Sequence, residues 1–440
     1  MADSTPRAPD PAVAAALAEL GCPHGPLTLG GTAATELAAR HGTPLYAFDA
    51  ATLRNRVARV REAMGPRVEV LYSLKANPCV AVASLLRTAG TGCEIASLGE
   101  LEVARAAGFD PRELRFAGPG KSVEELATAL DHGVGVFHVE CASELRDLAS
   151  LAARRGTRAK VALRVHPGAG PAGSRMRMSG ASSRFGIDVA QVPALVAETR
   201  ATGSLQLVGL HVYGGTQLFD AHSFVQQARQ LVVHADAWER EFGVRLDELD
   251  VGGGFGVATF AGDGAFDLDA AAAGLREVVQ QHDRPGRRWF VELGRWICGP
   301  AGVYLTRVIR TKESGGIRHA VVDGGMHHCA AAAGVGTVLR RSALLVAAQR
   351  PLESGPAQTV GGVLCTPQVA LAQFRQRHRL RELREGDLVA VLHAGAYGTT
   401  FSPNGFLGHP APAEVLVEQG SSRVVRARGI AADTLRGQRW

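Results

Sequence analysis

The sequence contains no run of about 18 apolar residues, and its N-terminus lacks the charged and then apolar build of a signal peptide. Neither a membrane span nor a signal peptide is therefore predicted. Cys-x-x-Cys pairs are also missing. The seven cysteines are scattered along the chain, at Cys22, Cys79, Cys93, Cys141, Cys298, Cys329 and Cys365. An odd, unpatterned set in a long chain predicts reduced thiols and a cytoplasmic protein.

Aromatic residues are scarce, at 5%, and they are not interleaved with basic residues as a nucleic-acid platform requires. Nucleic-acid binding is therefore not expected. The net charge of +6 comes from dispersed arginines and could steer an acidic partner towards the protein. The contents of 46% hydrophobic and 20% charged residues are typical of a globular protein, and 440 residues suit two domains.

Lysine is the scarcest charged residue. Of 48 basic residues only four are lysines, namely Lys75, Lys121, Lys160 and Lys312. A lysine kept against this bias is a candidate for chemistry that arginine cannot perform, such as losing its proton to act as a nucleophile. Lys75 follows the apolar run in LYSLKANP (71–78), where a buried strand would end. The simpler interpretation of Lys75 is a solvated charge on a loop.

From about residue 66 the chain alternates short apolar runs with longer amphipathic segments, which predicts parallel strands joined by helices. The expected strands are VEVLYSL (68–74), CEIAS (93–97), LRFAG (114–118), GVFHVE (135–140), KVALRVH (160–166), LVGLHVYG (207–214), ELDVGGG (248–254) and WFVELGR (289–295). Eight evenly spaced units over ~230 residues favour an α/β fold of the closed (β/α)8 TIM-barrel type over an open, doubly wound sheet.

After residue 300 the chain becomes rich in β-like segments separated by Gly, Pro and Ser, which predicts an antiparallel β-sandwich or barrel. We expect residues 1–49 to lead from this β domain into the barrel. Residues 50–300 would form the barrel and residues 301–440 the β domain.

Polar residues gather where the expected barrel strands end, and barrel enzymes place their sites at these ends. The candidates are Lys75, Glu94, Lys121, Arg164, His211, Glu292, Arg295 and the glycine run 252–256. Each has an ordinary alternative: a structural histidine, a tight turn, an ion pair between Glu292 and Arg295, or a lysine that only opens a helix. Together, an amine, an imidazole, a phosphate-sized glycine loop and a carboxylate suit pyridoxal phosphate.

No metal site is predicted. The segment MHHC (326–329) groups His327, His328 and Cys329, but adjacent residues of a strand or loop point apart.

The sequence resembles the fold-type III pyridoxal-phosphate decarboxylases, which include the diaminopimelate, ornithine and arginine decarboxylases. The resemblance covers about residues 45 to 420. It is carried, in order, by YSLKANP, CEIASLGELE, GPGKS, SRFGI, HVYGGTQ, DVGGGFG, ELGRWICGPAG, VVDGGM, VLCTP and GAYG…HPAPAEVLV.

The resemblance implies a role for each matching residue. Lys75 would form the Schiff base with the cofactor, His211 would stack on its ring, and Glu292 would face its ring nitrogen. Cys365 would be the proton donor, entering the site of the facing protomer, so a homodimer with shared sites is implied. The other expected cofactor-binding residues are Glu94, Arg164, Gly253, Gly254, Gly256, Gly294, Arg295 and Tyr397; Arg295, Thr366 and Tyr397 are expected to bind substrate.

Two departures from the family pattern concern the substrate. Diaminopimelate and ornithine enzymes carry an acidic residue after the cysteine, whereas Cys365 is followed by Thr366, Pro367 and Gln368. The R-P-x-L-Y segment of the diaminopimelate enzymes is also replaced, by HHCAAAAGVGTVLRR (327–341). A substrate with a distal ammonium is therefore disfavoured, because burying that charge unpaired costs several kcal/mol.

The variant segments DGGMHH, LCTP and SPNGFLGHPAPAEVLV are similar to a subgroup from secondary-metabolite and exopolysaccharide gene clusters, which includes the butirosin glutamyl carrier-protein decarboxylase. This similarity implies decarboxylation of an α-amino acid, with an acyl-carrier protein as a potential partner. The alternatives are a diaminopimelate or basic amino-acid decarboxylase, an amino-acid racemase on the same fold, and a non-catalytic pyridoxal-phosphate carrier.

Overall fold

The eight apolar runs fold as parallel strands that close into a barrel. Pairing follows the order β4–β5–β6–β7–β8–β11–β13–β14 and returns from β14 to β4. The strands are β4 (Val68–Ser73), β5 (Gly92–Ile95), β6 (Leu114–Phe116), β7 (Val136–Val139), β8 (Ala159–His166), β11 (Leu205–His211), β13 (Glu248–Gly253) and β14 (Arg288–Leu293).

The computed structural model describes residues 10–166, 174–177, 183–334, 342–366 and 377–439, and these fall into two units. The barrel unit comprises Asn55–Gly256 and Ala265–Trp296, and the second unit comprises the other described residues.

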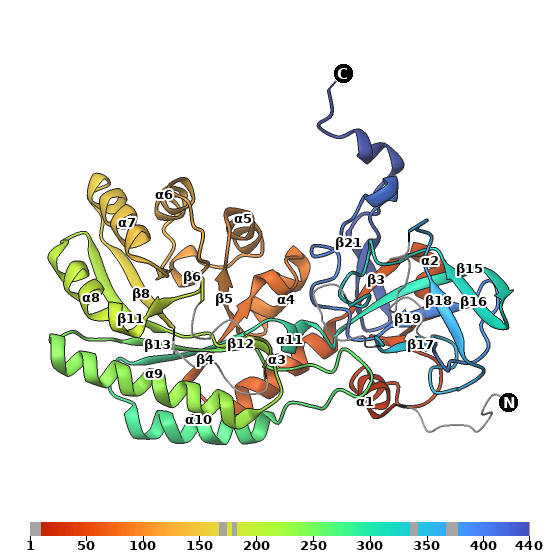
Figure 1. Cartoon of the computed structure of the whole chain (residues 1–440), viewed down its shortest axis with the longest axis horizontal. Helices are drawn as coiled ribbons and strands as arrows, with labels where there is room; N and C mark the ends of the chain where they lie inside the picture. Colours follow the sequence, from red (N-terminus) through yellow and green to blue (C-terminus); the bar gives the residue numbers. More distant parts are fainter. Residues whose placement is uncertain (1–9, 167–173, 178–182, 335–341, 367–376, 440) are drawn as a thin grey trace. The chain divides into compact units, whose positions relative to one another are not determined.

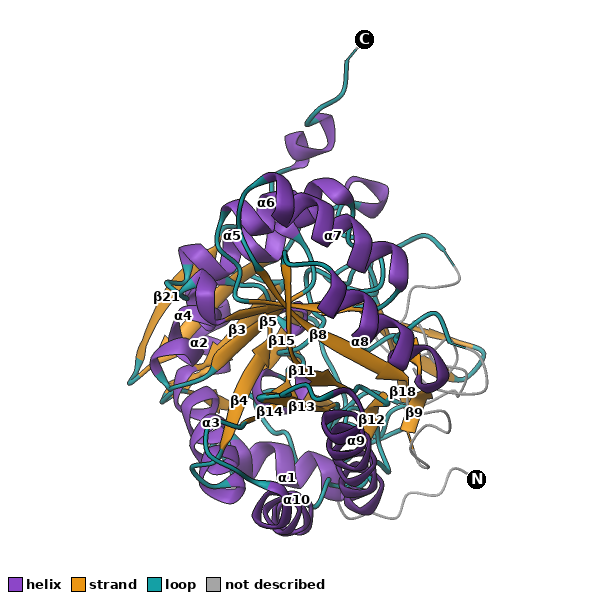
Figure 2. Cartoon of the chain, turned by 90° about the vertical axis from the view of Figure 1, so that its left-hand side faces the viewer, coloured by secondary structure: helices purple, strands orange, loops and turns teal. Residues whose placement is uncertain are grey.

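Helices surround the barrel strands, as the end-on view in Figure 2 shows. They are α4 (Val80–Thr88), α5 (Leu98–Ala106), α6 (Val123–Asp131), α7 (Ala142–Arg154), α8 (Val192–Ala201), α9 (Ala221–Phe242) and α10 (Leu268–His282). Helix α6 begins at a capping box, in which the backbone N–H groups of Ser122 and Glu125 each donate to the other's side chain. Because the eight strands run parallel, their C-terminal ends gather at one mouth of the barrel.

The strands are buried along nearly their whole length, as expected where helices cover a parallel sheet. Strand register then decides which polar side chains meet. Arg164 of β8, His211 of β11 and Asp250 of β13 lie in register on adjacent strands. Glu292 of β14 is in register with Leu71 of β4. Residues far apart in the sequence therefore reach the same part of the barrel.

The second unit contains a mixed sheet with strand order β17–β19–β15–β3–β20–β21. Figure 1 labels all of these strands except β20. Its strands are β3 (Leu45–Asp49), β15 (Gly302–Ser314), β17 (Leu345–Ala347), β19 (Leu388–Val391), β20 (Ala413–Glu418) and β21 (Ser421–Arg426). In addition, β16 (Ile317–Val322) pairs with β15, and β18 (Gln358–Gly361) pairs with β16. Strand β3 is buried throughout. The apolar core of this unit also includes residues of α1 (Pro11–Glu19) and α2 (Ala34–His41).

Smaller elements complete the described chain. Strands β1 (Thr28–Leu29) and β2 (Thr32–Ala33) form a hairpin, β10 (Ile187–Asp188) pairs with β8, and β9 (Ser174–Arg177) pairs with β12 (Gly215–Leu218). Helices α3 (Ala50–Met64) and α11 (Arg295–Cys298) lie where the chain passes from one unit to the other.

The predicted fold class is confirmed, with a closed parallel barrel and a second, sheet-rich part. The second sheet is not purely antiparallel, because β3 pairs in parallel with β20 and β16 in parallel with β18. None of the helices in the described part of the chain combines the length and apolar character needed to cross a bilayer.

Candidate active site

Lys75 reaches the mouth of the barrel from the turn after β4. It lies in the short 3-10 helix η1 (Leu74–Ala76), and its Nζ donates to both carboxylate oxygens of Glu94 on β5, at 3.0 Å each. The Glu94 side chain is 2% exposed and that of Lys75 38% exposed. The ring of Tyr213 lies 5.7 Å from the same Nζ. The structure thus brings together two predicted site residues and holds the amine at a fixed, accessible position.

Glu100 adds a titratable group beside this pair. It lies in the first turn of α5, where its side chain accepts a hydrogen bond from the backbone N–H of Ala96 at 2.7 Å. Burial and the nearby charge of Glu94 raise the pKa of Glu100 to about 7. Ser97, also at this strand end, caps α5 by accepting from the Glu100 N–H. Its role is therefore structural.

Arg164 on β8 forms a buried ion pair with Glu140, which follows β7, at 2.7 Å. The two oxygens of Glu140 also accept from the backbone N–H groups of Gly118 and Gly186, at 3.0 Å each. Lys121 is engaged in the same way, because its Nζ contacts Glu144 at 2.8 Å and donates to two backbone carbonyls. Lys121 is thus a buried structural lysine, whereas Lys75 is accessible.

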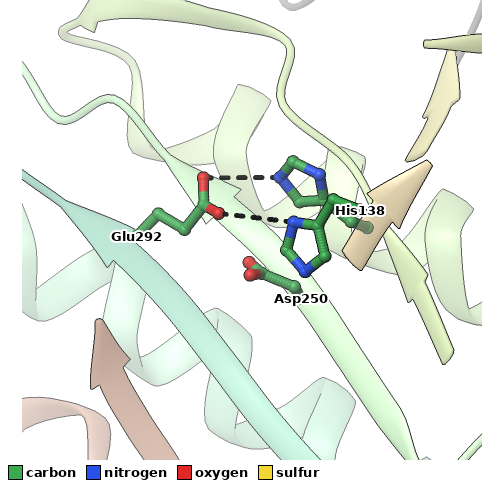
Figure 3. Close-up of side chains that lie close together, drawn as sticks. His138, Asp250 and Glu292 are labelled. Carbon is green, nitrogen blue, oxygen red and sulfur yellow. Dashed lines mark ion pairs between the residues drawn. The ribbon is translucent and has the colours of Figure 1, made fainter. Parts of the chain in front are cut away.

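His211 and Glu292 lie inside the barrel, each almost completely buried. Nε2 of His211 is 3.3 Å from Oε2 of Glu292, and one face of the His211 ring stacks on His138 of β7 at a centroid distance of 4.3 Å. Oε1 of Glu292 faces Nδ1 of His138 at 3.9 Å (Figure 3). Burial lowers the pKa values of both histidines well below their ordinary value, so both are neutral at pH 7.

Asp250 of β13 completes this group. Its Oδ1 accepts from the backbone N–H of Gly252 at 2.9 Å. Burial, followed by the neighbouring charge of Glu292, raises the pKa of Asp250 well above its ordinary value. One ligand atom from each of His138, His211, Asp250 and Glu292 lies within 4.8 Å of the others, so this set could hold a cation as well as face a cofactor.

The glycine run after β13 is required by close backbone contacts. A Cβ atom at Gly252 would overlap the carbonyl oxygen of Val212, and one at Gly254 that of Gly215. Both glycines also have a positive φ, of 68° and 77°. At Gly253 a Cβ would overlap the carbonyl oxygen of Glu292. The glycines are therefore required by close packing against neighbouring backbone, and their part in phosphate binding remains a prediction.

An aromatic anchor fixes this loop. Phe255 packs edge-on against Phe224 of α9, with centroids 4.8 Å apart, and stacks on Phe266 at 4.2 Å. The N–H of Gly256 already donates to the carbonyl of Leu218 at 2.7 Å. Its predicted part in phosphate binding would therefore rest on close approach of its Cα rather than on its N–H.

Gly294 and Arg295 follow β14. A Cβ at Gly294 would lie 2.7 Å from the Cβ of Ala76, so this glycine allows the end of β14 to pack against the turn that carries Lys75. Arg295 is half-buried at the start of α11. Their predicted contacts with cofactor and substrate remain predictions.

Three predicted residues lie in the second unit. Cys365 is an exposed free thiol, and the buried hydroxyl of Thr366 has no hydrogen-bond partner in the described chain. Tyr397 has a φ of 54°, a left-handed conformation that is rare for a non-glycine residue. Such local strain of about 1–3 kcal/mol is typical of functional positions. The assignment of these residues to the active site remains a prediction.

The MHHC segment is also in the second unit. The expectation that His327 and His328 point apart is wrong, because their ring centroids lie 3.8 Å from each other. Both nitrogens of His328 are engaged, Nε2 by the carbonyl of Pro410 at 2.9 Å and Nδ1 by the hydroxyl of Tyr304 at 3.2 Å. His328 is thus a structural histidine whose nitrogens are not available to a metal.

Sequence reasoning missed Tyr213, His138, Glu140 and Asp250. All four lie within expected strands, close to the residues that were selected. Because strands of a covered barrel are apolar on both faces, period-2 alternation does not tell which side chains point inwards. The signal that could have identified these residues is their position near the C-terminal end of an expected strand.

Comparisons with known proteins agree on one family. The family model described as "Pyridoxal-dependent decarboxylase, pyridoxal binding domain" matches residues 50–299. A Niallia circulans protein named L-glutamyl-[BtrI acyl-carrier protein] decarboxylase is 34% identical, covering 92% of this chain and 95% of that protein. A diaminopimelate decarboxylase from Actinosynnema pretiosum subsp. auranticum is 35% identical, covering 97% and 96%. The crystal structure of diaminopimelate decarboxylase from Helicobacter pylori complexed with L-lysine gives a TM-score of 0.82 at 26% identity, covering 91% and 98%.

Proposed function

The chain belongs to the family of pyridoxal-dependent decarboxylases, and from this membership we propose that it decarboxylates an α-amino acid carried as a thioester on an acyl-carrier protein. The observation that carries this substrate assignment is the sequence Thr366-Pro367-Gln368 after Cys365, which contains no carboxylate. A free basic amino acid would bury its distal ammonium there without a counter-charge, at a cost of several kcal/mol. A carrier-bound glutamyl group has no such ammonium.

The protein's charge and one relative support the carrier. The net charge of +6 favours an acidic partner. The relative from Niallia circulans is named for a glutamyl group on an acyl-carrier protein. Diaminopimelate decarboxylases of similar identity make free diaminopimelate the competing substrate.

Pyridoxal phosphate fits the residues at the barrel mouth. Lys75 offers an accessible amine, oriented by Glu94. By resemblance, the glycine run after β13, whose backbone packs closely against neighbouring segments, would offer its N–H groups to the phosphate. Glu292 would hold the ring nitrogen, and the His211 face opposite His138 would pack on the ring. When bound, the cofactor takes up the electron pair that is released as the bond from Cα to the carboxylate breaks.

The protein's own groups do the remaining work. The Lys75 amine would hold the cofactor and yield its place to the substrate amine, with Glu94 keeping Nζ within reach. The Glu292 carboxylate would stabilise positive charge on the ring nitrogen. After CO2 leaves, Cα needs a proton, and we assign its delivery to Sγ of Cys365.

By resemblance, the enzyme would act as a homodimer in which Cys365 belongs to the partner's site. Mixing two inactive variants, Lys75→Arg and Cys365→Ala, tests this arrangement, because random re-pairing leaves some dimers with one intact site. We expect recovery of about a quarter of the wild-type activity. No recovery after verified subunit exchange would contradict shared sites.

The substrate is tested by measuring CO2 release from a glutamyl-loaded carrier protein and from free glutamate, diaminopimelate, ornithine, lysine and arginine. We expect kcat/KM for the loaded carrier to exceed that for every free amino acid by at least about 10²-fold. Comparable turnover of free diaminopimelate or ornithine would overturn the carrier assignment while leaving the decarboxylase activity intact.

A gain-of-function variant sharpens this test. Thr366→Glu restores a carboxylate after Cys365, and we expect it to shift the ratio of kcat/KM values towards basic amino acids by at least about tenfold. Thr366→Gln is the matched control of similar size without the charge. An unchanged ratio in Thr366→Glu would show that this position does not contact the distal group.

A further inference from the structure

Four side chains from four different strands meet inside the barrel: His138 of β7, His211 of β11, Asp250 of β13 and Glu292 of β14. Figure 3 shows Glu292 facing His138, with Asp250 beside them. We call these four residues the buried cluster. Each is at most 2% exposed, and one ligand atom from each lies within 4.8 Å of the others.

The cluster contains polar atoms without partners. Among the described residues, Nδ1 of His138 and Nδ1 of His211 have no hydrogen-bond partner, and Nε2 of His211 has only the 3.3 Å contact with Oε2 of Glu292. Oδ2 of Asp250 and Oε1 of Glu292 accept from no donor, although the two carboxylates lie close enough to share a proton. Buried polar groups in folded proteins are nearly always bonded, and each exception calls for an explanation. Unpaired atoms on all four residues, converging at one place, point to a ligand that binds them together.

The charge of the cluster indicates what kind of ligand this is. Asp250 and Glu292 are two buried carboxylates, and the basic side chains around them already contact other acids. Lys75 pairs with Glu94, Lys121 with Glu144, Arg164 with Glu140 and Arg115 with Glu248. The protonated ring nitrogen of pyridoxal phosphate would offer only one N–H to these four side chains. Two carboxylates and two imidazoles whose ligand atoms lie within 4.8 Å of one another are better matched by a dication.

We propose that, when the protein is free of cofactor, the buried cluster binds one divalent transition-metal ion of the Zn2+ or Co2+ class. Two imidazole nitrogens and two carboxylate oxygens make a four-coordinate donor set of the kind that Zn2+ accepts. Imidazole ligands favour such ions over Mg2+ and Ca2+, which prefer oxygen ligands alone.

The ion and pyridoxal phosphate exclude each other, because both need His211 and Glu292. This second statement rests on the proposed function, whereas the metal site itself does not. Metal binding would therefore hold the protein in an inactive form until chelation or a high cofactor concentration releases the site.

The test uses the full chain after removal of cofactor and treatment with a chelator. Co2+ is the probe, because tetrahedral coordination by nitrogen and oxygen gives an intense visible absorption. We expect one Co2+ per chain, displaced by Zn2+ and blocked when the protein is first loaded with pyridoxal phosphate. Failure of Co2+ and Zn2+ to bind would overturn the proposal and would mean that protons alone satisfy the carboxylates.

His138→Asn is the informative variant, because His138 is not among the residues expected to hold the cofactor. We expect its affinity for Co2+ to fall at least about tenfold while pyridoxal phosphate still binds. The matched control is His222→Asn on the exposed start of α9, which should bind Co2+ as the wild type does. Equal Co2+ binding by His138→Asn and the wild type would overturn the proposal. If His138→Asn does not fold, Asp250→Asn takes its place.

Exposed thiols are the main source of adventitious binding, since Cys141 and Cys365 both lie at the surface. X-ray absorption of the Zn2+ form separates the two cases: nitrogen and oxygen ligands at about 2.0–2.2 Å support the buried cluster, and sulfur at about 2.3 Å overturns it. If metal binds as expected but pyridoxal phosphate does not bind at all, the proposed function fails and the metal site stands. If pyridoxal phosphate binds and no metal binds, the metal site fails and the proposed function stands.

Discussion

The carboxylates of the barrel fall into two groups that differ in their partners. Glu94, Glu140 and Glu144 each contact a basic side chain, in the pairs Glu94–Lys75, Glu140–Arg164 and Glu144–Lys121. On β13 and β14, Asp250 and Glu292 contact no basic residue other than histidine in the described part of the chain. The negative charge of the first group is therefore balanced by a neighbouring cation, whereas that of the second group is not.

The presence or absence of a basic partner separates the carboxylates that position a cation from those that are available to a ligand. A buried carboxylate with its own cation and hydrogen bonds is satisfied, and it fixes the position of that cation, as Glu94 does for the Lys75 amine. A buried carboxylate without a cation must be satisfied by a proton or by a ligand. We therefore propose that the paired acids Glu94, Glu140 and Glu144 position cations, and that Asp250 and Glu292 bind the ligand.

The largest expected effect comes from Lys75. Lys75→Arg keeps a cation beside Glu94 but removes the nucleophile, so we expect CO2 release to fall at least about 10³-fold with little change in the unfolding midpoint. Lys160→Ala, at an exposed position of β8, is the control that should retain full activity. Borohydride reduction followed by mass spectrometry should locate the cofactor on residue 75. Its attachment to Lys121 would refute this assignment.

Breaking the buried ion pair between Glu140 and Arg164 should have the next largest effect. Glu140→Gln leaves Arg164 as a buried charge without its carboxylate, and we expect the free energy of unfolding to fall by about 3–5 kcal/mol. Urea unfolding of the full chain measures this change. The control is Glu198→Gln, whose pair with Arg146 is largely exposed and should contribute about 0–1 kcal/mol. Equal effects would remove the distinction between buried and exposed pairs.

Replacing the acid by its amide at Asp250 should not lower the free energy of unfolding, in contrast to the same replacement at Glu140. Asp250→Asn removes a negative charge next to Glu292 and retains an oxygen that can accept from the Gly252 N–H. In protein free of cofactor and metal, we expect the free energy of unfolding to stay constant or to rise by about 1 kcal/mol. A loss as large as that of Glu140→Gln would show that Asp250 has a cationic partner after all.

The smallest expected effect is a pH dependence at Glu100. Its pKa is raised to about 7 in the folded protein, so the folded state binds the proton more tightly than the unfolded state. The corresponding stability is present in full below about pH 4 and is lost as the pH rises through 7. Glu100→Gln should reduce the change of the unfolding midpoint between about pH 5 and 8. We expect the reduction to correspond to about 1 kcal/mol of unfolding free energy. Glu102→Gln on the same helix should leave the slope unchanged.

Local patterns in the sequence were sufficient for the barrel and for its principal amine. Short apolar runs at regular spacing predict parallel strands, because only alternating strands and helices bury such runs. Lys75 could be selected because a lysine at a strand end, in a chain that otherwise uses arginine, is visible without tertiary information. The glycine run was visible for the same reason, and the structure accounts for it by backbone contacts that a Cβ would block.

The tertiary structure alone decided which acids are paired. Glu292 meets His138 and His211 only because the barrel closes and its register brings β7, β11 and β14 to one level. Strands that are apolar on both faces carry no alternation to tell which side chain points inwards, so His138 and Asp250 could not be singled out. Pairing is a property of distances across strands, and the sequence order of this chain does not contain those distances.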